Sequence, residues 1–230
     1  MDDPDRRRAR RRRRQRQLRR RILIVLICVG ICLTAGIKFG KEVLFGEQKG
    51  EQFYSEADLP GAPEITVDLL DVNEYSRPGI PLKQINGVVI HYTGNPGSSA
   101  KANRDYFNGL KDSQERSASS HFIVGLNGEV IQCVPSSEIA YASNDRNSDT
   151  LSIECCHPDE SGQFAETTYQ SMVELTGWLC ARFGLSSDDV IRHYDVTGKI
   201  CPKYFVEHED AWNQFKADVN NKIIAVQDSM

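Results

Sequence analysis

The 230-residue chain is long enough for one good-sized domain with additional segments. Its net charge of −4 combines two unlike parts, because residues 1–21 contain twelve Arg and three Asp. This basic head has a net charge of +9, so the remaining residues carry −13. The overall charge therefore indicates no class of partner. The acidic body is also large enough to fold without the support of disulfides.

Seven cysteines are divided between an apolar segment near the N-terminus and the acidic body. Five lie in the body, and because five is odd, any disulfide scheme leaves at least one thiol over. We therefore make no prediction about disulfide bonds in the body. We expect four of the five to fill the core: Cys133, Cys155, Cys156 and Cys180.

An uncharged stretch of sixteen residues runs from Ile22 to Ile37. At about 1.5 Å per residue it spans about 24 Å, and its flanks extend it towards the roughly 30 Å of a bilayer core. We predict a transmembrane anchor over 22–45, with residues 1–21 as a basic cytoplasmic tail and the body on the extracellular, cell-wall side. The alternative is a cleaved signal peptide, but its basic and apolar regions would both be unusually long. Orientation of an anchor also explains the Arg run more economically than nucleic-acid binding, so we expect no nucleic-acid partner.

Residues 46–62 are polar, rich in Gly and Glu and without periodicity, which is typical of a stalk. The folded domain is expected over 63–230. It begins with a short apolar run at 65–72, which precedes a β-branched run at 87–93 that predicts a buried strand. A helix is expected over 98–110, where Ser98 or Ser99 can cap the N-terminus and three residues repeat at helical spacing: Ala102, Tyr106 and Leu110.

The second half of the body continues to alternate strand-like and helix-like runs. An Asn127-Gly128 pair between apolar runs predicts a β-hairpin over 121–134. The elements after it are a strand at 150–156, a helix at 166–183 that stops at Gly184, a short strand at 190–193 and a closing helix at 207–227. This order predicts a single α/β domain with a central mixed β-sheet flanked by helices.

Three residues that can bind a metal lie where predicted strands end. His91 and His193 each follow a β-branched run, and Cys201 comes eight residues after His193. In α/β sheets chemistry is usually placed at strand ends. Two imidazoles and one thiolate leave one tetrahedral position open, which suits a catalytic zinc. From residue types alone, the alternative of two structural histidines and a buried thiol stays open.

Several separated motifs resemble one family. They are His91-Tyr92-Thr93-Gly94-Asn95, the hairpin with His121-Phe122-Ile123-Val124 and Asn127-Gly128, and the run Arg192-His193-Tyr194-Asp195 that continues to Lys199-Ile200-Cys201-Pro202. Together, over residues 64–215, they resemble the zinc-dependent N-acetylmuramoyl-L-alanine amidases, which include phage and bacterial autolytic amidases and animal peptidoglycan-recognition proteins. The resemblance implies Zn²⁺ as cofactor, with His91, His193 and Cys201 as its ligands.

Two further residues are expected to take part in the chemistry. Glu154 ends an apolar strand, so its carboxylate should face a partly desolvated cleft, and it matches the catalytic Glu of bacterial family members. The resemblance implies that Lys199 stabilises the oxyanion. Asp195 either accepts a hydrogen bond from a ligand imidazole or anchors the 193–201 loop.

The sequence departs from the family pattern at two places. Ser120 stands where many phage relatives have Tyr, and Ala140-Tyr141-Ala142 replaces a Trp-His segment. Substrate contacts are assigned to Asn95, His121 and Asn144, with a structural role as the alternative for His121. His157 and His208 are expected to be solvated.

The predicted activity is zinc-dependent hydrolysis of the amide bond between N-acetylmuramic acid and L-alanine in peptidoglycan. The alternative is a peptidoglycan-binding sensor without catalysis. In either case we expect a monomer that meets the membrane only through its N-terminal helix.

Overall fold

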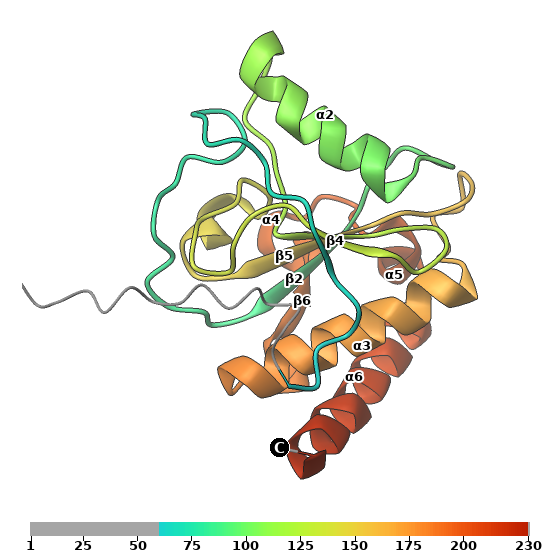
Figure 1. Cartoon of the computed structure of the whole chain (residues 1–230). Helices are drawn as coiled ribbons and strands as arrows, with labels where there is room; N and C mark the ends of the chain where they lie inside the picture. Colours follow the sequence, from blue (N-terminus) through green and yellow to red (C-terminus); the bar gives the residue numbers. More distant parts are fainter. Residues whose placement is uncertain (1–59, 230) are drawn as a thin grey trace, which may run out of the picture. The chain divides into compact units, whose positions relative to one another are not determined.

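The computed structural model describes residues 60–229, which form an α/β domain with a six-stranded sheet between layers of helices (Figure 1). The predicted tail and anchor, and most of the predicted stalk, lie outside the described residues. Within the described part of the chain, no helix is long and apolar enough to cross a membrane.

The sheet has the order β1-β4-β3-β5-β2-β6. Its strands are β1 (Thr66–Val67), β2 (Val88–Tyr92), β3 (Phe122–Val124), β4 (Val130–Gln132), β5 (Leu151–Cys155) and β6 (Val190–Arg192). Only the hairpin pair β3–β4 is antiparallel among these strands, and every other pair is parallel. The predicted mixed sheet is therefore confirmed.

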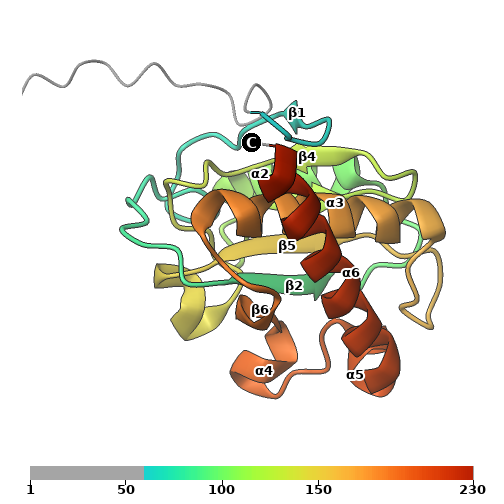
Figure 2. The ribbon, with the colours of Figure 1, turned by 90° about the horizontal axis from the view of Figure 1, so that it is seen from below.

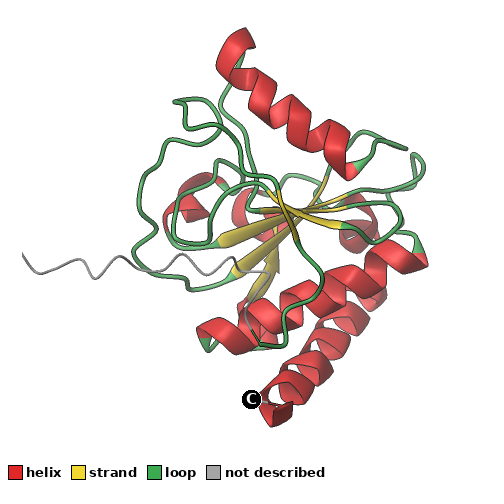
Figure 3. Cartoon of the chain, viewed as in Figure 1, coloured by secondary structure: helices red, strands yellow, loops and turns green. Residues whose placement is uncertain are grey.

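The helices cover both faces of this sheet, as Figure 3 shows in red against the yellow strands. α2 (Ala100–Ser113) packs against β3 and β4 on one face, and α3 (Glu166–Phe183) covers the other. α6 (Glu209–Ser229) crosses α3, which Figure 2 shows from below. The short helical segments are η2 (Asn144–Ser148), η3 (Ser187–Asp189), α4 (His193–Thr197) and α5 (Lys203–Glu207).

The helix ends follow from local sequence. The side chain of Ser99 accepts a hydrogen bond from the amide of Ala102, so Ser99 is the N-cap of α2. α3 ends at Gly184, whose φ of 68° lies in the left-handed region that favours glycine. The predicted face of α2 was partly wrong: Phe107 and Leu110 are buried, whereas Tyr106 is exposed.

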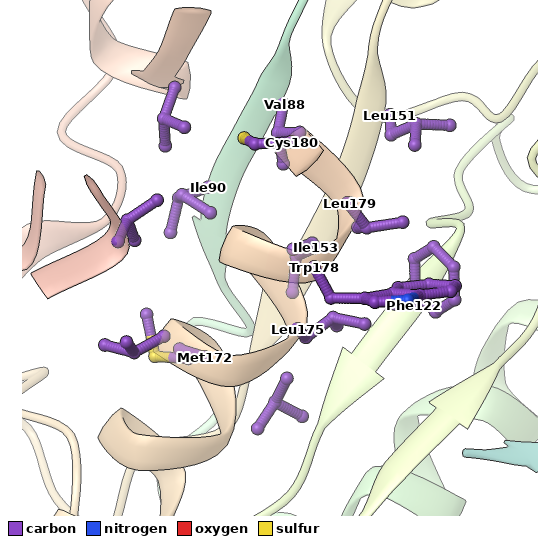
Figure 4. Packing of buried hydrophobic residues seen from close by; sticks show 14 of the residues in the cluster. Val88, Ile90, Phe122, Leu151, Ile153, Met172, Leu175, Trp178, Leu179 and Cys180 are labelled. Atoms are coloured by element: carbon purple, nitrogen blue, oxygen red, sulfur yellow. The ribbon is translucent and has the colours of Figure 1, made fainter. Parts of the chain in front are cut away.

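Two hydrophobic clusters lie on opposite faces of the sheet, because successive strand residues point to opposite sides. In the larger cluster, Met172, Leu175, Trp178 and Leu179 of α3 meet Val88, Ile90, Phe122 and Ile153 of the sheet (Figure 4). In the smaller one, Ile123 and Ile131 meet Phe107 and Leu110 of α2. The rigid sheet between these clusters fixes the strand ends where the candidate site lies.

The five cysteines of the described residues have free, buried thiols. Cys133, Cys155, Cys156 and Cys180 belong to the two hydrophobic clusters, as predicted. His208 is exposed, as predicted. The prediction of a solvated His157 is wrong, because this residue is 2% exposed and packs against the ring of Tyr92.

Candidate metal centre

Strand register brings the predicted site residues to one edge of the sheet. β2 and β5 are parallel, with His91 directly opposite Glu154. β2 and β6 are also parallel, and Ile90 lies opposite Arg192. His91 follows Ile90 and His193 follows Arg192. The carboxyl ends of the three adjacent strands β5, β2 and β6 therefore bring together both imidazoles and the Glu154 carboxylate.

The third candidate metal ligand is the sulfur of Cys201, in the loop after α4. Cys201 Sγ lies 3.9 Å from His91 Nδ1, and the two imidazole centroids are 4.6 Å apart. Ligand atoms of His91, His193 and Cys201 all lie within 4.8 Å of one another. The three residues are 2%, 6% and 1% exposed, so the structure brings the three predicted ligands together in one buried cluster.

Burial sets the protonation of this cluster. It lowers the pKa of His91, with further lowering by His193 and Lys199, and it also lowers the pKa of His193. Both imidazoles are therefore neutral near pH 7 and have lone pairs available. Burial raises the pKa of the Cys201 thiol to about 12, so a bound cation would be needed to hold it as a thiolate.

The donor set fits zinc. Nδ1 of His193 is buried and has no hydrogen-bond partner among residues 60–229. A buried polar atom without a partner is costly, and a metal bond would satisfy it. Two neutral imidazoles and a sulfur are ligands that zinc prefers, and with three protein ligands one position remains for water or substrate.

Glu154 lies beside this cluster at the cavity wall. Its Oε2 atom is buried and finds no hydrogen-bond donor in the described part of the chain. Burial raises the pKa of the Glu154 carboxyl to about 8, against a smaller lowering by the charge of Lys199. A carboxyl group that titrates near neutral pH is suited to general acid–base chemistry.

Lys199 is exposed on the loop before Cys201 and lines the same cavity. Its positive charge lowers the pKa of Glu154, His91 and Cys201, so it influences both the candidate ligands and the carboxyl group. The predicted role of Lys199 in stabilising negative charge stays a prediction.

The contacts of Asp195 are those of the second alternative, a loop anchor. Its Oδ1 and Oδ2 accept hydrogen bonds from the guanidinium of Arg192 at 2.9 and 3.1 Å, and Oδ2 also accepts from the Arg192 amide. Arg192 donates further to the carbonyl of Phe205 and to Glu209. Sequence reasoning missed this role of Arg192, which ties α4 to α5 and α6.

Of the two alternatives for His121, its surroundings fit the structural role and not the substrate contact. The residue is 1% exposed and does not line the cavity. Its Nδ1 accepts from the Ser152 amide at 3.0 Å, so its Nε2–H must donate to the Glu138 carbonyl at 2.9 Å. Burial lowers its pKa to about 4, which keeps this structural imidazole neutral.

A cavity of about 770 Å³ opens over the cluster. Asn95 and Asn144 both line it, which leaves their predicted substrate contacts open. Asn144 has in addition a contact that the sequence did not indicate, because its Oδ1 lies 3.0 Å from His193 Nε2. The far wall comes from α2 and the following loop, through Asn103, Tyr106, Phe107 and Arg116.

An α/β domain with two histidines and a cysteine at its strand ends, beside a buried carboxyl group, has the architecture of a metal-dependent hydrolase. Comparison with known proteins agrees with this class. Residues 81–204 match the Amidase_2 family, described as N-acetylmuramoyl-L-alanine amidase. The chain belongs to this family.

Similar proteins include bacterial amidases. The chain is 36% identical over 171 residues to the N-acetylmuramoyl-L-alanine amidase CwlL of Bacillus licheniformis, and 34% identical over 179 residues to BlyA of Bacillus subtilis (strain 168). Each alignment covers 69% of this chain and 47% of the relative, so the chain spans about half the length of these curated relatives.

Solved structures also resemble the domain. The catalytic domain of XlyA superposes with a TM-score of 0.57 at 26% identity, covering 68% of this chain and 99% of that one. PlyL superposes with a TM-score of 0.60 at 22% identity, covering 69% of this chain and 98% of that one, which supports the fold alone.

Proposed function

We propose that this protein is a zinc-dependent amidase that hydrolyses the bond between the lactyl group of N-acetylmuramic acid and the L-alanine of the peptidoglycan stem peptide. The observation that carries the proposal is the buried cluster of His91, His193 and Cys201, with ligand atoms within 4.8 Å of one another. Family membership and the similarity to bacterial amidases support the choice of bond and substrate.

His91, His193 and Cys201 would hold the zinc ion. Bound there, zinc supplies Lewis acidity, which lowers the pKa of a water molecule and polarises a carbonyl group. The burial of all three side chains excludes bulk water from this side of the site and strengthens electrostatic interactions within it.

Glu154 is the group placed to move the proton. In its ionised form this carboxylate accepts a proton from the attacking water and returns it to the leaving amino group of L-alanine. Burial raises its pKa to about 8 in the metal-free chain, which makes the ionised carboxylate a stronger base than an ordinary glutamate. Lys199 faces the same cavity and stabilises the negative charge that develops on the carbonyl oxygen.

The direct test is release of free amino groups from purified peptidoglycan by the full chain. Activity should disappear with a zinc chelator and return when zinc is added back. Cys201→Ala should be inactive under both conditions, whereas Cys180→Ala, altered in α3 away from the cavity, should stay active. Binding to peptidoglycan without release of amino groups would replace the amidase by a non-catalytic sensor.

We further propose that residues 22–45 anchor the enzyme in the cell membrane, with the catalytic domain on the cell-wall side. The sixteen uncharged residues from Ile22 to Ile37 and the adjacent Arg run support this orientation. The full chain should sediment with membranes, and external protease should remove the catalytic domain from intact protoplasts. Recovery of the full chain in the soluble fraction would contradict the anchor.

A further inference from the structure

The outer nitrogens of both candidate ligand imidazoles contact two consecutive residues. His91 Nε2 lies 3.1 Å from Ser143 Oγ, and His193 Nε2 lies 3.0 Å from Asn144 Oδ1. An amide oxygen only accepts hydrogen bonds, so His193 Nε2 must carry the proton. The Ser143 hydroxyl can accept in the same way from His91.

The contact with Asn144 fixes the tautomer of His193, and the Ser143 hydroxyl allows the same tautomer for His91. With Nε2 protonated, the lone pair of each neutral imidazole is on Nδ1. His91 Nδ1 is the atom that lies 3.9 Å from Cys201 Sγ, and His193 Nδ1 is buried without a partner within residues 60–229. Both lone pairs are thus available to the buried cluster with the sulfur.

The Ser143–Asn144 pair is itself held in place. The amides of Ala142 and Ser143 donate to Asn147 Oδ1 at 3.0 and 2.6 Å. Ser143 is 1% exposed, so its hydroxyl has little freedom to move. Asn144 has φ of 53°, a left-handed conformation that Asn tolerates better than most residues. The start of η2 is therefore a held turn, in which Ser143 Oγ and Asn144 Oδ1 each lie within hydrogen-bond distance of one imidazole.

We propose that Ser143 and Asn144 are positioning residues for the metal centre, which orient His91 and His193 so that Nδ1 of each binds the same divalent zinc ion. The inference rests on the proposed function for the identity of the ion. Its consequence is that one turn controls two ligands from different elements, His91 of β2 and His193 of α4. Loss of either contact frees a ring to rotate and turns its lone pair away from Cys201.

The test is the affinity of the metal-free full chain for zinc, measured by competition with a chromophoric chelator. Asn144→Gly keeps the left-handed backbone and removes the acceptor. Ser143→Ala removes the hydroxyl from a buried site. Each should weaken zinc binding by about 10- to 100-fold, the usual cost of losing an outer hydrogen bond to a ligand histidine.

Two variants serve as matched controls. Asn144→Asp retains an oxygen acceptor for His193 Nε2–H and should restore affinity close to that of the unaltered chain. Ser148→Ala removes a hydroxyl from the exposed end of the same turn, where it donates to the Asp145 carbonyl, and should leave affinity unchanged. Thermal unfolding of each metal-free variant separates a lost contact from a lost fold.

A second measurement identifies the ligand atoms directly. In the zinc-loaded chain with ¹⁵N-labelled histidine, NMR should report Nδ1 as the metal-bound nitrogen of His91 and His193, with Nε2 protonated. Nε2 coordination, or unchanged zinc affinity in both Asn144→Gly and Ser143→Ala, would overturn the positioning role while leaving the amidase intact. If the unaltered chain binds no zinc, the proposed function fails instead.

Discussion

Replacing Glu154 by Gln should stabilise the metal-free protein, and the gain should grow with pH. The pKa of the Glu154 carboxyl is raised from 4.5 to about 8 by burial. Below a pH of about 4.5, Glu154 is protonated in both the folded and the unfolded state and does not lower the free energy of unfolding. Between the two values the unfolded chain loses its proton while the folded chain keeps it, so stability falls as pH rises. Above the higher value the cost is constant.

The magnitude follows from about 1.36 kcal/mol per pKa unit of difference. The variant should gain about 1 kcal/mol at pH 5, about 3 kcal/mol at pH 7 and about 5 kcal/mol at pH 9 over the unaltered chain. These values are ceilings, because the open cavity admits water beside the carboxyl group and reduces the cost of its charge.

Urea unfolding of both chains in the presence of chelator, across this pH range, measures the difference. Taking the difference cancels the contributions of His91 and His193, which are present in both proteins. A gain that is the same at pH 5 and pH 9 would show that Glu154 is an ordinary solvated carboxylate. The reasoning for its role as proton carrier would then lose its physical basis.

Three further substitutions test other parts of the account. Lys199→Met should lower kcat by about 100- to 1000-fold, as for loss of an oxyanion donor, with zinc affinity nearly unchanged. Lys203→Met is the control, because the amine of Lys203 contacts the Glu160 carbonyl. Equal activity of the two variants would show that Lys199 takes no part in the chemistry. Cys201→Ser should weaken zinc binding by more than about 100-fold, which is the largest loss expected when a ligand histidine loses its outer hydrogen bond, because a hydroxyl does not replace a thiolate. Zinc affinity equal to that of the unaltered chain would exclude the sulfur as a ligand. Trp178→Ala should lower the free energy of unfolding by about 3 to 5 kcal/mol, because this side chain is 2% exposed in the larger cluster and donates to the Pro60 carbonyl; a loss below about 1 kcal/mol in urea unfolding would mean that the cluster repacks freely.

The sequence predicted the elements whose pattern is set by local interactions. The predicted helix bounds 166–183 are those of α3. An apolar face runs the length of this helix, and a left-handed glycine ends it. The Asn127-Gly128 hairpin and the strands at β2 and β5 are also confirmed. These features depend on residue spacing and turn chemistry, which a sequence displays directly.

The short helices, and the contacts between residues far apart in the chain, could not be predicted from the sequence. α4 and α5 have only five residues each, too few for a periodic pattern to appear. The burial of His157 was misjudged, and the two alternatives for His121 stayed open, because the burial of both residues depends on neighbours from distant strands and loops. Ser143 gave no signal, since a serine reports nothing about an imidazole 52 residues away until the sheet brings them together.

The candidate metal centre shows the same division. The residue types at three strand ends or following loops pointed to His91, His193 and Cys201, and the structure brings them together. Their lone-pair directions and the buried oxygen of Glu154 are properties of packing, so only the three-dimensional structure shows them.

Mass spectrometry of the peptidoglycan fragments released by the zinc-loaded full chain identifies the bond that is cut. A zinc amidase releases stem peptides that begin with a free L-alanine amino group, together with glycan that keeps an intact lactyl carboxyl group, and releases neither product when chelator is present. Fragments cut between sugars or within the stem peptide, or identical products with and without chelator, would contradict it.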